Sequence, residues 1–320
     1  MTVLRRLDPL IVLILSAVIL AIIAPASGSF AHWFSWATTF AIAALFFLQG
    51  ARLSPREALE GLSNWKLHLL ILAFTFLVFP IIGVALRPLS AVTSPELYQG
   101  VLYLTLVPST VQSSIAFTSI ARGNVAGAIV AASLSNLVGV VLTPLLVMAL
   151  MGGSGGLHID ASVFLDVALQ LFFPFMLGQL LRPWVKNFAA RKATSIVDRG
   201  SITMVVYSAF SGSVVAGIWS DTQVTDILIV VALSIVLVAF MLWLTRTVAR
   251  RLGFPRKDII AIEFCGTKKS LSSAVPMASI MFGGAQLGLL IVPIMIFHQV
   301  QLMMCSWLAS RYAQADGARG

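Results

Sequence analysis

Charged residues are scarce in this chain: Asp, Glu, Lys and Arg make up 10% of its 320 residues, whereas 59% are hydrophobic. Soluble domains carry about 25% charged residues, so this composition excludes an ordinary soluble domain and predicts an integral membrane protein. The chain has 2 cysteines, Cys265 and Cys305, both in apolar segments, which excludes a disulfide framework and favours packing. His32, His68 and His158 are too scattered along the chain to predict a metal site.

Apolar stretches recur along the whole chain. A hydrocarbon core about 30 Å thick needs about 20 apolar residues in a helix. Suitable stretches lie at residues 9–25, 33–50, 65–86, 97–121, 125–151, 161–182, 201–219, 225–245, 258–282 and 285–310. They predict an all-α protein with ten transmembrane helices. The first stretch has no separable cleavage site and is expected to be an uncleaved helix.

The basic residues give the predicted orientation. All 21 Lys and Arg residues except Arg87, Lys268 and Lys269 fall on one side of the ten predicted spans. The positive-inside rule makes that side cytoplasmic and predicts that both termini face the cytoplasm. The net charge of +9 therefore reflects topology, with some attraction to anionic lipid, and does not indicate nucleic-acid binding.

The two halves of the chain show a weak internal repeat at an offset of 160 residues. Residues 119–123 align with residues 279–283, and Ser113 aligns with Ser273. We expect a first five-helix repeat over residues 1–151, an outer linker over 152–160 and a second repeat over 161–312. Because five is an odd number, the second repeat must be inverted in the membrane. Inverted repeats are common in secondary transporters, whose substrate sites lie near the membrane midplane.

Predicted spans four and nine contain polar interruptions. Pro108 opens a polar run through residue 114, and span nine carries Glu263, Lys268 and Lys269. Each such charge costs about 2.5–3.5 kcal/mol at the membrane centre on the insertion scale. Glu263 and Lys268 could not pair in an unbroken helix, so either the helix breaks or each charge has a partner on another span. Both options predict a polar centre that binds a ligand; the alternative is a mildly kinked helix pair with interhelical hydrogen bonds.

These interruptions supply the candidate site residues. Hydroxyls and a carboxylate suit a small cation, whereas ammonium groups suit an anionic substrate. The predicted cation-binding residues are Ser113, Ser114, Glu263 and Thr267. The predicted substrate-binding or counter-charge residues are Lys268, Lys269, His298, Gln299, Thr110 and Gln112. The predicted helix-crossing residues are Pro108, Asn136, Ser133 and Ser270. We expect no catalytic residues, because no paired carboxylates or nucleophile–base set occurs, and no cofactor other than a coupling ion.

Four segments carry a family resemblance. They are residues 263–273, the turn at 121–126, Leu142-Thr143-Pro144 and Phe297-His298-Gln299. Together they resemble the bile acid:sodium symporter family, and specifically its cotransporter-7-like branch, which includes many bacterial proteins. The resemblance implies a core domain of spans 3–5 and 8–10 and a panel domain of spans 1, 2, 6 and 7. It also implies that spans four and nine cross at their breaks, with substrate in the cleft between core and panel.

The resemblance also assigns an ion site. The family's first sodium site would use Ser113, Ser114 and Glu263, but its hydroxyl positions in span five fall on Ala128 and Ala132 here. Ser133 and Ser135 lie only near those positions. We therefore expect at most one bound sodium, at Ser113, Ser114 and Glu263, with coupling by sodium or by a proton.

A second sodium site is not expected. Its family positions fall on Thr75, Thr267 and Lys268, and an ammonium group would repel the ion or take its place. His298 matches a family position that lines the substrate cleft; a packing role is the alternative.

The predicted function is secondary active transport, with symport of an organic anion by alternating access. The anion could be bile-acid-like. We expect a monomer in the bacterial inner membrane. The alternative is a non-transporting membrane regulator of ion homeostasis on the same fold.

Overall fold

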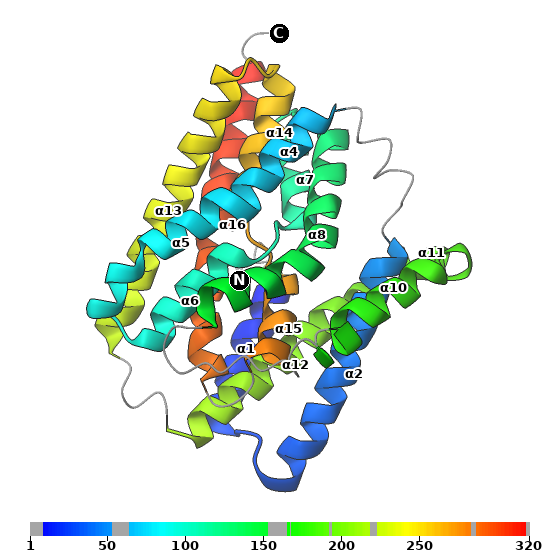
Figure 1. Ribbon diagram of the computed structural model, residues 1–320, viewed down its shortest axis with the longest axis vertical. Coiled ribbons are helices and arrows are strands. Elements are labelled where there is room, and N and C mark those ends of the chain that lie inside the picture. Colours follow the sequence, from blue (N-terminus) through cyan, green and yellow to red (C-terminus); the bar gives the residue numbers. More distant parts are fainter. Residues whose placement is uncertain are drawn as a thin grey trace. The chain divides into compact units, whose positions relative to one another are not determined.

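A computed structural model describes residues 9–52, 64–152, 165–166, 168–191, 194–217, 223–282 and 286–317. Within these ranges the regular elements are helices and no strand occurs (Figure 1). They are α1 (Pro9–Ile23), α2 (Gly28–Arg52), α4 (Trp65–Ala73), η3 (Phe74–Val78), α5 (Phe79–Ala85), η4 (Arg87–Ala91), α6 (Pro95–Leu106), α7 (Val111–Ile120), α8 (Val125–Met151), η5 (Ala168–Phe172), α10 (Phe173–Leu180), α11 (Arg182–Ala189), α12 (Ser195–Val215), α13 (Val224–Arg251), α14 (Arg256–Thr267), α15 (Leu271–Met281) and α16 (Leu287–Gly317). The all-α prediction is confirmed. The predicted linker, residues 152–160, lies outside the described residues except for Gly152.

Several helices are long and apolar enough to cross a membrane. In the described part of the chain these are Gly28–Arg52, Trp65–Ala91, Val125–Met151, Val224–Arg251 and Leu287–Ala315, with a sixth if α6 and α7 form one bent span. Shorter apolar helices cover Val12–Ile23 and Ala168–Leu180. The chain is therefore a multi-pass membrane protein. Predicted span nine is not among the long helices because α14 and α15 have only 12 and 11 residues.

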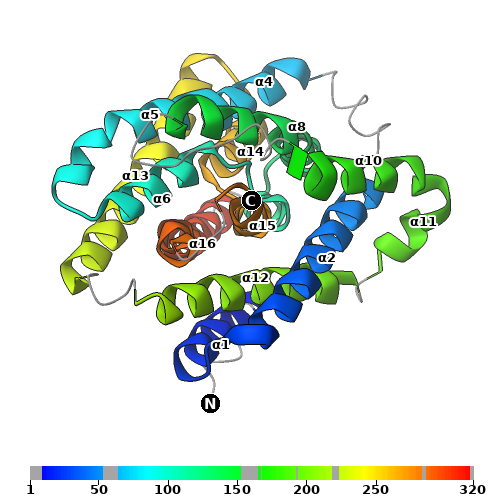
Figure 2. The same ribbon diagram turned by 60° about the horizontal axis from the view of Figure 1, so that its bottom comes forward.

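The chain forms two compact units. The first comprises residues 1–53, 156–222 and 275–291. In it α2 packs against α10 and α12, and α1 packs against α12 (Figure 2). Two glycines allow α2 and α10 to approach closely, since a Cβ on Gly50 or Gly178 would lie 2.1 Å from a backbone oxygen of the other helix. Arg52 pairs with Asp198 at 2.6 Å.

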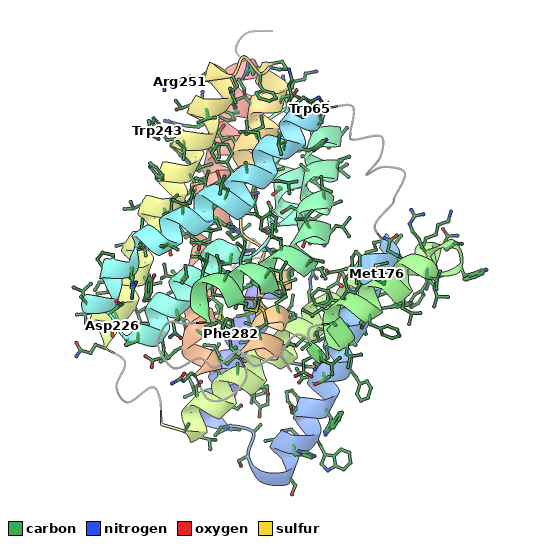
Figure 3. The ribbon with its side chains drawn as sticks, viewed as in Figure 1. Trp65, Met176, Asp226, Trp243, Arg251 and Phe282 are labelled. Carbon is green, nitrogen blue, oxygen red and sulfur yellow. The ribbon has the colours of Figure 1, made fainter. Side chains whose placement is uncertain are left out.

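The second unit comprises residues 54–155, 223–274 and 292–320. In it α14 packs against α4, α7, α8 and α13. Figure 3 shows Trp65 and Arg251 at one end of this unit and Asp226 at the other. Exposed apolar side chains such as Trp243, which is 60% exposed, cover its outside, as expected of a surface that faces lipid. Cys265 and Cys305 are both buried and free, as predicted.

Both predicted interruptions are present as helix breaks. α6 ends at Leu106 and α7 begins at Val111, with a bend of 62° between them. Val107 is extended, with ψ of 158°, because the following Pro108 disfavours a helical conformation there. α14 ends at Thr267, and Lys268 is extended with ψ of 151° before α15 begins. The option of an unbroken ninth helix is excluded.

Candidate ion and substrate site at the two helix breaks

The two breaks are bonded to each other within the second unit. The Ser270 N–H donates to the Pro108 carbonyl at 2.8 Å. The Ser109 hydroxyl donates to the Cys265 carbonyl at 2.7 Å, and the Thr110 hydroxyl donates to the Lys269 carbonyl at 2.8 Å. A helix end leaves backbone groups without intrahelical partners, and lipid offers none, so the breaks satisfy each other.

Asn136 on α8 joins both breaks. Its Nδ2 donates to the Ser109 carbonyl at 2.8 Å, and its Oδ1 accepts from the Ser273 hydroxyl at 2.7 Å. The neighbouring Ser135 hydroxyl accepts from the Ser109 N–H at 3.0 Å. None of these bonds involves Ser133, which is half-buried on the same helix. Polar residues of α8 therefore fix the geometry of the junction.

Lys269 is fully buried and fully bonded. Its Nζ donates three hydrogen bonds to backbone carbonyls, those of Thr75 at 2.8 Å, Thr105 at 2.8 Å and Val107 at 2.9 Å. Thr75 lies in the π-helical η3, where the hydrogen-bond register changes, and the other two carbonyls lie at the C-terminal end of α6. The ammonium also lies 4.2 Å from the Phe79 ring centre. These partners satisfy all three ammonium donors.

The backbone of Lys269 is held by Gln301, a residue that the sequence analysis missed. Gln301 Oε1 accepts from the Lys269 N–H at 2.9 Å, and Gln301 Nε2 donates to the Lys269 carbonyl at 2.8 Å. The same Nε2 lies 2.9 Å from His298 Nδ1. His298 is 6% exposed, so in this conformation its ring supports Gln301. The available signal was a polar residue one helical turn after His298 in an apolar helix.

Lys268 differs from its neighbour. It is also 0% exposed, but among the described residues its Nζ has no hydrogen-bond partner. The ammonium lies 3.9 Å from the Phe117 ring centre and 5.6 Å from that of Phe264. A cation–π contact supplies about 2 kcal/mol when desolvated, less than the several kcal/mol that burial of an ion costs. Lys268 is therefore under-compensated in this conformation.

Glu263 is paired with a tyrosine from α16. It is 2% exposed, and its two carboxylate oxygens lie 2.9 and 3.1 Å from the Tyr312 hydroxyl. Arg246 donates to the same hydroxyl, and its guanidinium lies 5.0 Å from the Tyr312 ring centre. The partner of Glu263 is thus on another helix, one of the two options that its distance from Lys268 had left. Neither Tyr312 nor Arg246 had been predicted.

The other predicted site residues lie on the helices around the breaks. The Ser113 Oγ is buried and has no hydrogen-bond partner among the residues that the structure describes. The Ser114 Oγ is likewise buried without a hydrogen-bond partner in the described part of the chain. Thr267 Oγ1 lies 3.4 Å from Thr245 Oγ1. Gln112 is exposed and Gln299 is half-buried.

Known proteins share this sequence over most of its length. The model of the SBF-like CPA transporter family matches residues 8–314. The chain belongs to this family. Being a member of the SBF-like CPA transporter family, it is a membrane transporter.

Three relatives are similar to this chain over most of its length. The chain is 47% identical to "Uncharacterized protein PA2026" of Pseudomonas aeruginosa, over 94% of this chain and 91% of the relative. It is 45% identical to "Putative symporter YfeH" of Escherichia coli, over 96% and 93%. It is 31% identical to "Sodium/bile acid cotransporter 7" of Xenopus tropicalis, over 86% and 84%. The family resemblance drawn from the sequence is confirmed.

Proposed function

We propose that this protein is a secondary active symporter of an organic anion that works by alternating access. The observation that carries the proposal is Lys268, a buried ammonium without a hydrogen-bond partner among the described residues, next to the junction of two broken helices. An anionic group that reaches Lys268 would supply the missing compensation. Intramembrane charges of this kind mark substrate and ion pathways.

A single mobile cation is proposed at Glu263. In support, its carboxylate is buried and the Ser113 hydroxyl on the adjacent α7 has no partner in the described part of the chain. Both are hard oxygen ligands that suit sodium, and the carboxylate could instead carry a proton. Ser114 and Thr267 complete the proposed set. Sodium or a proton is cargo here, moved together with the anion.

Lys269 is proposed to be a permanent internal cation. Three carbonyl oxygens and an aromatic face surround its ammonium, an environment that also suits a small metal cation. Because the lysine is covalently attached, it cannot be transported as cargo, and we propose that its three carbonyl partners keep it here throughout the transport cycle. Coupling then involves at most one mobile cation, at Glu263.

The proposed transporter also has a specific arrangement of transmembrane helices. We propose ten spans in two inverted repeats, with both termini in the cytoplasm, in a bacterial inner membrane. We also propose a panel of spans 1, 2, 6 and 7 and a core of spans 3–5 and 8–10. The division into units supports this in part, since predicted spans 1, 2, 6 and 7 fall in the first unit and predicted spans 3–5 and 8 in the second, whereas residues 275–291 of predicted spans nine and ten fall in the first unit. The relative named as a sodium/bile acid cotransporter supports an amphipathic carboxylate or sulfate as substrate.

Transport by purified protein in liposomes tests the function. A panel of amphipathic carboxylates and sulfates is screened for accumulation under an inward sodium gradient, a proton gradient and neither. The proposal predicts gradient-driven accumulation of at least one anion, lost in Lys268→Met and in Glu263→Gln. If no anion accumulates under any gradient while Glu263→Gln still alters cellular ion homeostasis, the protein is a regulator and the proposal is wrong.

A further inference from the structure

A second polar site lies at one end of the second unit, where α13 ends, α14 begins and α16 ends. It is a cavity of about 420 Å³, within the range of small-molecule sites. Its lining residues are Arg246, Arg250, Arg256, Ile259, Ile260, Glu263, Tyr312 and Ala315. It shares Glu263 with the proposed cation site and contains none of the residues proposed to bind the transported anion.

The charges of this cavity suit an anion. Arg246 and Arg250 come from α13 and Arg256 comes from α14, so guanidinium groups from two helices converge on one concavity. The lining includes one carboxylate, that of Glu263, which is already bonded to the Tyr312 hydroxyl. Guanidinium groups bind carboxylates and phosphates through paired N–H donors. The start of α14 adds positive potential, which the C-terminal ends of α13 and α16 oppose, so the arginines carry the attraction.

Membrane topology and the helix dipole explain only part of this arrangement of arginines. Basic residues are expected at the cytoplasmic ends of membrane helices and at the C-terminus of α13, where they complement the helix dipole. Arg251, which is exposed as Arg250 and Arg256 are, fits that description because it does not line the cavity. That Arg246, Arg250 and Arg256 from two helices line one open cavity is not required by topology.

We propose that this cavity binds a phosphate-class oxyanion at the end predicted to face the cytoplasm. The ligand is inorganic phosphate, a soluble phosphomonoester or the headgroup of an anionic phospholipid, which share the same chemistry. Arg250 and Arg256 bind its oxygens, and Ile259 and Ile260 supply the apolar wall.

The occupied cavity also acts on Glu263. Arg246 donates to the Tyr312 hydroxyl, and that hydroxyl donates to the Glu263 carboxylate. An oxyanion that draws Arg246 away changes the environment of Glu263. This regulatory consequence rests on the proposed function, whereas binding of the oxyanion does not.

Binding is tested on the purified full-length protein in detergent, without any transport measurement. Thermal unfolding and calorimetric titration use inorganic phosphate, with chloride at matched ionic strength for comparison. We expect saturable stabilisation by phosphate alone. Loss of one charge-assisted contact in Arg250→Gln or Arg256→Gln should weaken apparent affinity at least about tenfold. Arg251→Gln, one residue further along α13, is the matched control and should leave affinity unchanged.

The second arm identifies the source of the oxyanion. Wild type and Arg250→Gln are compared in phosphatidylcholine nanodiscs with and without phosphatidic acid. Stabilisation of wild type by phosphatidic acid that is lost in Arg250→Gln identifies a lipid headgroup, whereas an effect of inorganic phosphate alone identifies a soluble ligand. If neither phosphate nor phosphatidic acid distinguishes wild type from Arg250→Gln, the site does not exist. If the protein transports no anion in liposomes, the binding result still stands, because it is measured without a transport assay.

Discussion

The side-chain amide of Gln301 forms two hydrogen bonds with the backbone of Lys269, accepting from its N–H at 2.9 Å and donating to its carbonyl at 2.8 Å. This side-chain amide supplies the hydrogen bonds that a neighbouring helical turn would make if α14 and α15 were continuous. The backbone of the break is thereby fixed before any ligand arrives, and the direction of both lysine side chains is fixed with it.

Gln301→Leu should therefore destabilise the protein. It leaves a buried N–H without its partner and removes one of two donors to the Lys269 carbonyl, which retains Thr110. Each buried group left unsatisfied costs about 1–3 kcal/mol, so we expect a loss of roughly 1–4 kcal/mol. Thermal or denaturant unfolding in detergent measures it. Gln299→Leu, which breaks neither bond, is the control; equal losses in the two variants would contradict this role for Gln301.

Lys269→Met should also destabilise the protein, and in a cation-dependent manner. The methionine fills the apolar part of the space but leaves three buried carbonyls without their donor, a loss of several kcal/mol. A small monovalent cation can partly replace the ammonium in the variant. We expect the melting temperature of Lys269→Met to rise more than that of wild type when ammonium or sodium replaces choline, because the proposed cation site at Glu263 is present in both proteins. A variant as stable as wild type in choline would exclude the internal-cation role.

Lys268→Met should have the opposite effect on stability. The substitution removes a buried charge that has no hydrogen-bond partner among the described residues and keeps apolar contact with Phe117. Replacing such a charge with a hydrophobic residue is often stabilising by about 1–4 kcal/mol. The melting temperature should rise while anion transport is lost, which is the trade-off expected at a functional site. A fall in stability comparable to that of Lys269→Met would mean that Lys268 is structural.

The opposite roles of these neighbouring lysines show where sequence reasoning stops. The membrane class follows from composition, and the two breaks follow from Pro108 and from charges that lipid does not tolerate. Which lysine is satisfied depends on the direction of each side chain from an extended backbone, and on carbonyls far away in the chain, such as that of Thr75. The pairing of Glu263 with Tyr312 joins residues 49 positions apart and carries no local signal.

Tyr312→Phe tests the environment of Glu263. It removes the hydroxyl that bonds both carboxylate oxygens, while the ring keeps its contact with Phe264, 6.3 Å between centres. A hydrogen bond to a charged group is worth about 1.5–3 kcal/mol. In the proposed symporter, we expect a shift of at least about tenfold in the concentration of coupling cation that gives half-maximal transport. Tyr98→Phe removes a hydroxyl whose bond to Gly83 is 3.4 Å long and should change little. Similar cation dependence in wild type and Tyr312→Phe would separate Glu263 from coupling.

Gly139→Ala tests whether close packing of α8 holds the first break. A Cβ at Gly139 would lie 2.7 Å from the Cβ of Pro108, so α8 or the break must move. Overpacking of this kind costs about 1–3 kcal/mol. Gly212→Ala on α12 is the matched control, because nothing lies within 4 Å of its added Cβ and alanine favours the helix by about 1 kcal/mol. The two substitutions should therefore change the free energy of unfolding in opposite directions. A Gly139→Ala variant as stable as Gly212→Ala would mean that the Pro108 segment yields freely and that α8 does not fix the break.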